Sequence, residues 1–358
     1  MMCDNEGLME KIIKKLVKEA KYELFHYPET TRKQDFKYFF KRMLRPANTP
    51  KRDFFFWTHA MLAQALEQTN ELEVLKQYYD AWIEKGLPIY NLDNIMNGYS
   101  LLYVYEKMED QKYKQAADKL YDWICEYAKQ MGNPLPYRNH HPAHVYVDGL
   151  GMVVPFLCRY GAMFDNQEAI NLGVKQILEF FKNGMDETTG LPYHGYDTKK
   201  HVKQGIIGWG RAVGWLMLAI ADSLEYVQDD EDRKELIRGF EKLARATIQY
   251  LREDGYFSWQ LSAMEGPKDT SATAMIGYAL KKSVSVGIIK QELSICNQGR
   301  EINLKKAIQK MEAALLTSCK NGKIYDCSGE CEGFSQYPQV YGAYPWSLGP
   351  GARMLLMK

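Results

Sequence analysis

Two kinds of helical pattern alternate along this chain. In the first kind, apolar residues recur three or four positions apart with charged residues between them, as in DDEDRKELIRGFEKLARATIQYL. This pattern is typical of an amphipathic helix that packs one face inward and exposes the other to water. It occurs approximately at residues 8–24, 71–85, 112–131, 167–184, 231–252 and 303–320.

The second kind of segment is poor in charge and rich in Gly, Ala, Met and aromatic residues, as in GRAVGWLMLAIADSL. A helix that is apolar around most of its circumference is buried on most sides. Segments of this kind lie approximately at residues 53–68, 93–107, 148–162, 209–227, 270–283 and 342–357.

The alternation predicts six helical hairpins, each with one charged outer helix and one apolar inner helix. The inner helices start about 40 to 70 residues apart, which is an irregular internal repeat. Six hairpins closed into a ring form an (α/α)6 toroid, and no low-complexity linker interrupts the chain. We therefore expect an all-α fold with a single domain over residues 1–358. The stretches EDGYFSWQL and NGKIYDCSG predict small hairpins or loops at one rim.

Alternating hairpins make all inner helices run in the same direction, so their N-termini share one face. Free N–H groups and helix dipoles make such a face attractive to an anion. Residues at or just before these helix starts are therefore the candidates for chemistry. They include two carboxylates, a histidine, an arginine and two tryptophans: Asp93, Asp148, His194, Arg211, Trp209 and Trp215. This set suits acid/base chemistry on a sugar that carries a carboxylate.

Each candidate also has a purely structural interpretation. Asp93 and Asp148 stand where an aspartate commonly caps a helix by accepting bonds from backbone N–H groups. Arg211 suits a buried ion pair, and the tryptophans suit the core. The cluster HHPAH (His140, His141 and His144) resembles part of a metal site, but no further ligand pattern completes it. We expect neither a metal nor a cofactor.

Composition narrows the class of partner. The chain has 46 basic and 45 acidic residues, which removes nucleic acid and acidic membranes as default partners. No apolar run approaches the roughly 18 residues that a membrane span needs, and the N-terminal stretch has no signal-peptide pattern. Seven scattered cysteines, an odd number, indicate reduced thiols. These features predict a cytoplasmic protein, and they leave its oligomeric state open.

Five stretches resemble the unsaturated glucuronyl and rhamnogalacturonyl hydrolases, glycoside hydrolase families 88 and 105, and family 105 more closely. They are LDNIMNGYSLLYVYEKMEDQKY, HPAHVYVDGLGMVVPFL, TGLPYHGYD, GWGRAVGWLMLAIADSLE and DTSATAMIGYAL. They occur in the family's order and cover the chain from about residue 50 to its end. The resemblance implies an (α/α)6 barrel without a metal. It also implies hydrolysis of the terminal 4,5-unsaturated uronic acid that polysaccharide lyases leave, from a rhamnogalacturonan-type disaccharide in the first instance.

The resemblance places Asp148 on the family's catalytic acid and Asp93 on its second essential aspartate. It places His194, Arg211, Trp209 and Trp215 on positions that contact substrate. Three positions depart from the family pattern. Tyr137 stands where a histidine is common, with His140 three residues later; Tyr146 replaces a tryptophan, and His144 replaces a glutamine. These positions face the sugar and its leaving group, so they bear on substrate identity.

The implied reaction begins with protonation of C4 of the unsaturated ring. Water then adds at C5, and the resulting hemiketal opens and releases the partner sugar. A helix N-terminus lowers the pKa of a carboxyl group, whereas a general acid needs a raised pKa. A second carboxylate near Asp148 would keep one proton bound, and Asp93 is the candidate.

Other functions remain open from the sequence. One is another (α/α)6 carbohydrate enzyme, such as an ordinary uronidase or a sugar epimerase. Another is a non-catalytic toroid that binds oligosaccharides or a protein partner, because a fold alone does not establish an activity.

Overall fold

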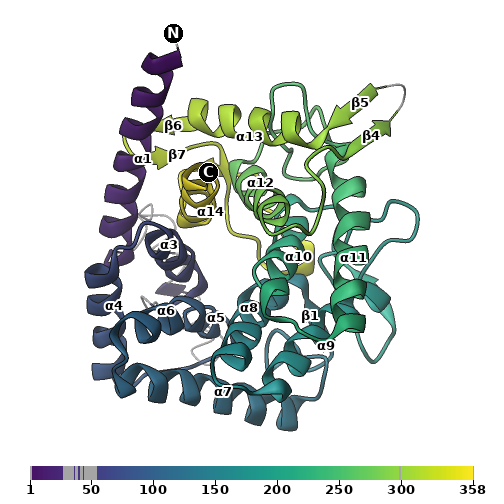
Figure 1. Ribbon diagram of the computed structural model, residues 1–358. Coiled ribbons are helices and arrows are strands. Elements are labelled where there is room, and N and C mark those ends of the chain that lie inside the picture. The colour runs from purple at the N-terminus through teal and green to yellow at the C-terminus, as the bar shows by residue number, and fades with distance from the viewer. Residues whose placement is uncertain are drawn as a thin grey trace.

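The computed structural model describes residues 2–26, 55–297 and 300–357, together with four isolated residues between 36 and 43. Its helices form two concentric layers (Figure 1). The outer layer consists of α1 (Met2–Leu24), α4 (Leu72–Glu84), α7 (Gln111–Met131), α9 (Gln167–Asn183), α11 (Asp230–Ile248) and α13 (Leu304–Ser318). The inner layer consists of α3 (Trp57–Gln68), α5 (Leu92–Ile95) with α6 (Gly98–Met108), α8 (Val147–Met163), α10 (Gly210–Ala221), α12 (Thr270–Ser285) and α14 (Pro345–Leu356).

The inner helices contact one another in chain order, and α14 packs back against α3. The ring therefore closes, and the predicted all-α toroid is confirmed. Every residue of α10 is buried, whereas α11 exposes most of its charged residues. This difference is the physical basis of the two sequence patterns. Within the described part of the chain, no helix is both long and apolar enough to cross a bilayer.

Glycines allow the inner helices to approach closely. A Cβ atom on Gly151 of α8 would lie 2.4 Å from the ring of Trp215 on α10. A Cβ atom on Gly214 of α10 would lie 2.6 Å from the Cβ of Met275 on α12. Similar contacts occur at other inner-helix interfaces, at Gly98, Gly277 and Gly349. Since interiors are packed without spare volume, these positions exclude a side chain, which explains the glycine content of the inner set.

The second inner helix differs from the continuous segment predicted at 93–107. It is broken into α5 and α6 at Met96 and Asn97. Two tyrosines of α4 hold the break: the Tyr78 hydroxyl donates to the Asn97 side chain, and the Tyr79 hydroxyl donates to the Asn97 carbonyl, both at 2.8 Å. The Asn97 carbonyl also accepts the backbone N–H of Leu101 at 3.1 Å, so these tertiary bonds add to the helical ones. A periodicity of apolar residues does not reveal them.

Other helix ends also differ from the prediction. The segment predicted at 209–227 ends as a helix at Ala221 and continues as the short 3-10 helix η1 (Leu224–Tyr226). The segment at 342–357 starts as a helix only at Pro345, a residue type suited to the first helical position. The segment at 53–68 starts at Trp57; residues 53 and 54 lie outside the described part.

Several short strands lie on the face where the inner helices begin. Strands β1 (His144–Tyr146), β2 (Gly195–Asp197) and β3 (Val202–Gln204) form an antiparallel sheet in that order, with Tyr146 opposite Gly195. A further pair, β4 (Ser294–Asn297) with β5 (Arg300–Asn303), follows the C-terminal end of α12 and therefore lies toward the opposite end of the ring. Two more pairs precede α14: β6 (Cys319–Lys320) with β7 (Lys323–Ile324), and β8 (Cys327–Ser328) with β9 (Tyr341–Gly342). The last two pairs confirm the small hairpins expected around NGKIYDCSG.

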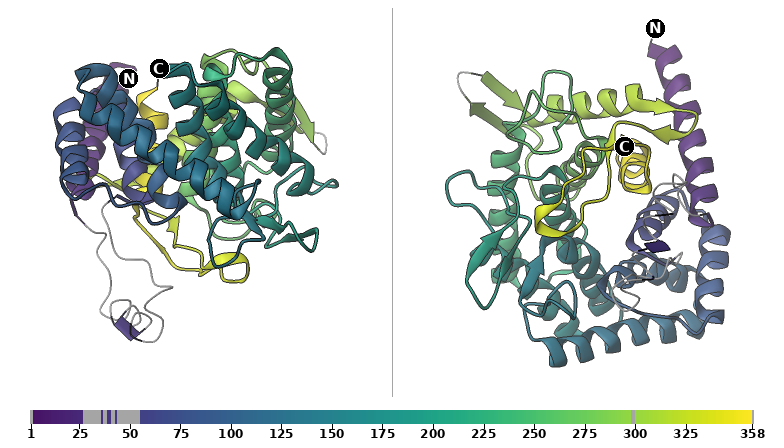
Figure 2. Two further views of the ribbon diagram at one scale, coloured as in Figure 1. Left: turned by 90° about the horizontal axis from the view of Figure 1, so that it is seen from below. Right: turned by 180° about the vertical axis from the view of Figure 1, so that it is seen from behind.

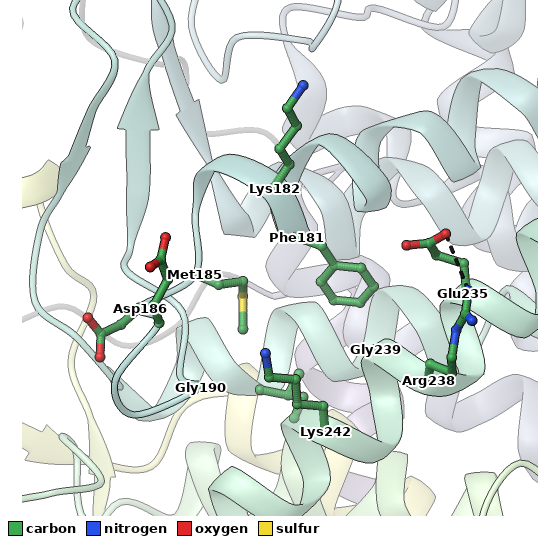
Figure 3. A pocket seen from close by; sticks show the side chains of 11 residues that line it. Phe181, Lys182, Met185, Asp186, Gly190, Glu235, Arg238, Gly239 and Lys242 are labelled. Carbon is green, nitrogen blue, oxygen red and sulfur yellow. Dashed lines mark ion pairs between the residues drawn. The ribbon is translucent and has the colours of Figure 1, made fainter.

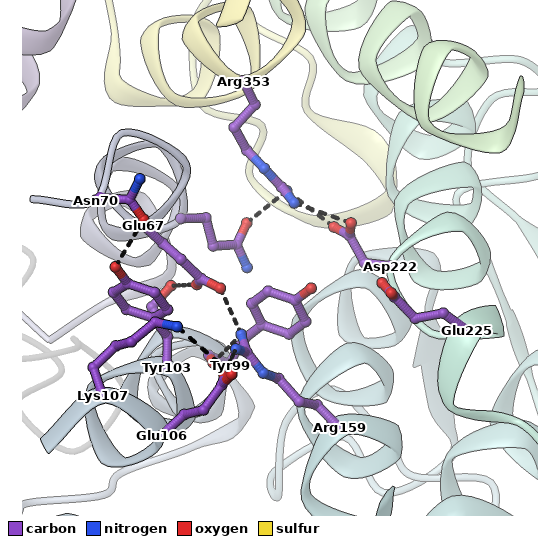
Figure 4. Close-up of polar contacts among 12 residues, drawn as sticks. Glu67, Asn70, Tyr99, Tyr103, Glu106, Lys107, Arg159, Asp222, Glu225 and Arg353 are labelled. Carbon is purple, nitrogen blue, oxygen red and sulfur yellow. Dashed lines mark hydrogen bonds and ion pairs between the residues drawn. The ribbon is translucent and has the colours of Figure 1, made fainter. Parts of the chain in front are cut away.

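Charged residues close the opposite end of the ring, where the inner helices end (Figure 4). Arg353 of α14 pairs with Asp222 at 2.9 Å and donates to Gln64 of α3 at 3.0 Å. Arg159 of α8 pairs with Glu67 of α3 at 2.7 Å. Burial opposes ionisation of Asp222, but the charge of Arg353 outweighs it and lowers the pKa of that carboxyl group. These buried pairs tie non-adjacent helices together at this end.

Glu23 of α1 predicts a pH-dependent loss of stability. Its carboxylate lies 3.8 Å from Nζ of Lys323 in β7, and burial raises its pKa to about 7 although Lys323 opposes the shift. The folded pKa lies above the unfolded value of about 4.3. Stability is therefore highest below about pH 4 and falls as pH rises through the folded pKa. Ionised Glu23 costs roughly 4 kcal/mol at most, from about 1.4 kcal/mol per unit.

We expect Glu23→Gln to raise the free energy of unfolding at about pH 8 and to change it little at about pH 4. Denaturant unfolding at both pH values measures this. Glu19, which pairs with the same lysine at 3.3 Å, supplies the control variant Glu19→Gln, for which we expect no gain at the higher pH. An equal effect of Glu23→Gln at both pH values would show that ionisation is not the cause.

Candidate active site

The starts of the inner helices converge on one face of the ring. Trp57 at the start of α3 lies within 5.7 Å of Trp215 of α10 and 5.3 Å of Trp346 of α14, measured between ring centroids. Arg211 near the start of α10 lies 3.9 Å from Asp269, which caps α12. This is the arrangement that parallel inner helices predict, and it gathers the candidate residues on a single rim.

Asp148 lies in the first turn of α8, directly after strand β1. The capping interpretation of Asp148 is wrong: Tyr146 is the N-cap residue, and no side chain caps this helix. The Val147 N–H donates to the carbonyl of His194 at 3.0 Å. The Asp148 carboxylate instead pairs with the Nε2 atom of His194 at 3.0 Å, and the residue is 8% exposed. Its oxygen atoms thus belong to the site and not to the helix end.

His194 connects Asp148 to a hydroxyl group. The Nδ1 atom of this buried imidazole lies 2.8 Å from the Tyr337 hydroxyl, which also accepts the N–H of Ile206 at 3.3 Å. An imidazole with a partner on each nitrogen has a fixed ring orientation and passes a proton from one side to the other. Asp148, His194 and Tyr337 therefore form a chain along which a proton can move.

Asp93 is fully buried in the first turn of the short helix α5. Asn91 caps this helix and forms a capping box with Asn94. The interpretation of Asp93 as a helix cap is therefore also wrong. Its carboxylate accepts a bond from the Tyr137 hydroxyl at 2.7 Å and pairs with Arg138 at 2.8 Å. Arg138 also lies over the Tyr137 ring, 3.9 Å from its centroid. Sequence analysis missed Arg138, although it follows directly after a candidate residue.

Tyr137 bonds one of the two carboxylates and feels the charge of the other. Burial raises its pKa, and the negative charges of both Asp93 and Asp148 raise it further. Of these two carboxylates, its hydroxyl donates only to that of Asp93. The like-charge argument made from the sequence omitted Arg138, whose positive charge offsets that of Asp93.

Aromatic rings form a wall around the Asp148–His194 pair. Tyr146 stacks on Phe334 with ring centroids 3.9 Å apart, and its ring meets His194 edge-on at 5.0 Å. Trp209 lies 4.5 Å from His194 on another side. Flat apolar faces beside polar groups are what sugar rings stack on. Phe334 and Tyr337 were missed because they come from a late loop without a recognisable pattern.

Two sequence candidates take part in packing. Trp215 is 1% exposed and lies between Gly151 and the ring of Trp57. Arg211 is buried, and its guanidinium donates to the carbonyls of Ser328 and Gly329 at 2.9 and 2.6 Å. The structure therefore does not bring these two side chains to the open face beside Asp148.

The histidines before Asp148 lie at the edge of the site. His140 is exposed, and His144 of β1 stacks on His141 and lies 3.5 Å from the Asp197 carboxylate. Among the described residues, no group of three His, Cys, Asp or Glu side chains could hold a metal ion. His144 also lies 5.3 Å from the Phe334 ring, at the outer edge of the aromatic wall.

A separate groove of about 300 Å³ lies on the outer wall of the ring, between α9 and α11 (Figure 3). Its lining combines Phe181 and Met185 with charged residues such as Lys182, Glu235 and Arg238. None of the candidate residues lines it.

The hydroxyl of Tyr337 provides a test of the proton chain. We expect Tyr337→Phe to lower kcat about two- to tenfold with little change in KM, because it removes one hydrogen bond, worth about 0.5–1.5 kcal/mol, from His194. Steady-state kinetics measures both constants. Tyr341, whose hydroxyl bonds Gln339 at 2.9 Å, supplies the control Tyr341→Phe. An unchanged kcat in Tyr337→Phe would remove Tyr337 from the chain.

Comparison with known proteins gives consistent results. The model for Glycosyl Hydrolase Family 88 matches residues 41–338. The unsaturated rhamnogalacturonyl hydrolase YesR of Bacillus subtilis is 25% identical over 235 residues, which are 64% of this chain and 68% of that protein. The resemblance found in the sequence is thereby confirmed.

Solved structures share the fold. A possible member of the GH105 family from Salmonella enterica superposes with a TM-score of 0.80 at 17% identity, over 96% of this chain and 93% of that one. An unsaturated glucuronyl hydrolase specific for heparin superposes with a TM-score of 0.69 at 17% identity, over 98% and 96% of the two chains.

Proposed function

The chain belongs to glycosyl hydrolase family 88 and is a glycoside hydrolase, and on this premise we propose that it removes a terminal 4,5-unsaturated uronic acid from a lyase-generated disaccharide. A rhamnogalacturonan-type disaccharide, with rhamnose as the leaving sugar, is the proposed substrate. The similarity to YesR supports this choice of leaving sugar. The starts of several inner helices on the same face favour the negatively charged uronate.

The observation that carries the proposal is the contact between Asp148 and His194, 3.0 Å between Oδ2 and Nε2. Hydration of a vinyl ether needs one proton donor at C4 and a site for one water. Asp148, which pairs with His194 beside the aromatic rings, donates the proton to C4. The His194 imidazole returns a proton to Asp148 after each turnover. The Tyr337 hydroxyl bonds the other nitrogen of that imidazole.

Asp93 has a different proposed role. It is fully buried and already binds Tyr137 and Arg138. It therefore keeps these two side chains oriented toward the substrate and acts on the sugar through them. Arg138 retains 26% exposure of its side chain, so its free edge is available to substrate.

The remaining candidates have proposed roles around this pair. Tyr146 supplies a face for the sugar rings, and His140 and His144 lie where the leaving sugar would extend. Trp209, which is 2% exposed, packs against His194 and supports its ring. Arg211 acts on the substrate through the loop that it holds, and Trp215 supports the floor of the site.

A panel of unsaturated disaccharides tests the proposed function. Vinyl-ether hydration consumes the ultraviolet absorbance of the conjugated uronate, whereas a uronidase or an epimerase leaves it intact. We expect the purified protein to remove this absorbance fastest with the unsaturated galacturonyl-rhamnose disaccharide. Release of the sugar without loss of absorbance would refute vinyl-ether hydration. Binding without any reaction would favour a non-catalytic protein.

A further inference from the structure

The loop between β8 and β9, residues 329–340, crosses the face of the ring where the site lies; the C-terminal part of the chain is yellow in Figure 2. Its base is fixed, because the Gly329 N–H donates to the Val340 carbonyl at 2.7 Å and continues the pairing of the two strands. Its tip contains the short 3-10 helix η2 (Gly333–Ser335), which carries the half-buried ring of Phe334. Phe334 thus stands at the tip of a loop that is held at its base.

The Phe334 ring fills a slot beside the His194 imidazole. Gly195 of β2 lies opposite Tyr146 of β1, and a Cβ atom on Gly195 would lie 2.7 Å from the Phe334 ring. The Phe334 and Tyr146 rings are parallel within 6°, with centroids 3.9 Å apart. The Phe334 ring meets that of His194 at right angles, with centroids 5.4 Å apart. The slot is therefore one ring thick: the face of Tyr146 bounds it, and the missing side chain at Gly195 makes room for it.

Phe334 covers a face of Tyr146 that a sugar would need. The other phenolic ring that packs on Tyr146 is that of Tyr137, with centroids 5.0 Å apart. Tyr137 is fixed, since its hydroxyl donates to Asp93 at 2.7 Å. The Phe334 side chain has no polar atom, so ring contacts alone hold it in the slot. Of the two rings, Phe334 is the one that can leave.

The geometry of the stack makes its loss inexpensive. Aromatic pairs prefer offset or edge-to-face arrangements to a direct face-to-face stack, because both ring faces carry partial negative charge. The Phe334 and Tyr146 rings, nearly parallel with centroids only 3.9 Å apart, come close to the less favoured arrangement. A sugar ring in the same slot would turn C–H groups, which carry partial positive charge, toward the face of Tyr146.

We infer that Phe334 occupies the subsite of the leaving sugar, and that the substrate displaces it from Tyr146. The inference rests on the proposed function. The uronate presents C4 to Asp148, so the slot beside His194 receives the next ring along the substrate. On its outer side the Phe334 ring lies 5.3 Å from that of His144, toward the rim where the leaving sugar would extend. Since Phe334 has to leave first, the apparent affinity is reduced by the fraction of molecules in which the slot is open.

Binding measurements in an Asp148→Asn background test this without turnover. Calorimetry with the unsaturated galacturonyl-rhamnose disaccharide compares Phe334→Ala and Phe334→Trp with the parent. We expect Phe334→Ala to tighten binding about two- to tenfold, because no ring then has to leave the slot. We expect Phe334→Trp to weaken binding, because a larger ring covers Tyr146 more fully. If Phe334 were instead a platform for the sugar, both effects would have the opposite sign.

Two controls locate the effect. Val340→Ala removes an apolar side chain that is 53% exposed on the same loop, and we expect it to leave the affinity unchanged. The second control is a ligand, the methyl glycoside of the same unsaturated uronate, which lacks the leaving sugar. We expect Phe334→Ala to change its binding less than about twofold, a difference of about 0.4 kcal/mol.

The inference is overturned if Phe334→Ala weakens binding of the disaccharide, if Val340→Ala tightens it equally, or if neither the parent nor its variants bind. An equal gain for the methyl glycoside would place the uronate in the slot and overturn its assignment to the leaving sugar. Hydrolysis by the wild-type protein is scored separately: its absence refutes the proposed function, whereas an unchanged affinity in Phe334→Ala refutes the displacement of Phe334.

Discussion

Asp148→Asn abolishes turnover and leaves the fold intact: this is the largest effect that the structure predicts. An amide cannot supply the proton that C4 needs, and general acid/base groups contribute about 10²- to 10⁴-fold in rate. Asn is nearly isosteric and still offers a hydrogen-bonding group to His194, which lies 3.0 Å away. Since Asp148 does not cap α8, the helix loses no bond, and we expect a melting temperature close to that of the wild type.

The measurement is kcat/KM on a substrate that the wild type cleaves, with a thermal melt of the same preparation. Asp165, exposed just beyond the far end of the same helix, supplies the control Asp165→Asn, which should be fully active. Near-normal activity in Asp148→Asn would end the assignment of this residue as the proton donor.

Asp93→Asn is expected to reduce both activity and stability. The carboxylate accepts the Tyr137 hydroxyl and pairs with Arg138, and a hydrogen bond to a charged group contributes about 1.5–3 kcal/mol. Its loss frees both side chains from their positions. We expect kcat/KM to fall about 10²-fold, of the order seen for positioned catalytic groups, and the free energy of unfolding to fall by about 1–3 kcal/mol.

A double-mutant cycle with Arg138→Gln separates positioning from direct contact with the substrate. Residues in one polar network show interaction energies of about 0.5–3 kcal/mol. If Asp93 acts partly through Arg138, the double variant loses less than the sum of the two single variants. Strictly additive losses in kcat/KM would show that the two residues act independently, against the role proposed for the pair.

The fold was predictable because its signals are local. Charge and apolar spacing separate the outer and inner helices, and the glycines of the inner set are required by contacts such as that between Gly151 and Trp215. The break between α5 and α6 was not predictable, because it depends on hydroxyl groups that α4 brings from another part of the chain.

The candidate site was predictable only in part. Asp93, Asp148 and His194 were found because they stand at or before inner-helix starts and match a family pattern. Their capping interpretation failed because the signals lay in neighbouring residues: Asn91 and Asn94 form the capping box of α5. Trp215 and Arg211 have the residue types of a sugar site, but the sequence does not show which way a side chain on a buried helix points.

The residues missed entirely share one cause. Phe334 and Tyr337 lie on a loop that returns to the site from nearly 200 residues after Asp148. Contacts of such long sequence separation leave no periodic pattern. Arg138 was missed for another reason: a single arginine beside a tyrosine carries no signal until its partner Asp93 is placed next to it.

The most direct test of hydration by Asp148 is to follow the reaction in deuterated, ¹⁸O-labelled water and to examine the released uronic acid by NMR and mass spectrometry. We predict deuterium at C4 and labelled oxygen at C5, with both labels lost together with turnover in Asp148→Asn. Labelled oxygen at C1 with no deuterium at C4 would show ordinary cleavage of the glycosidic bond and would contradict this account.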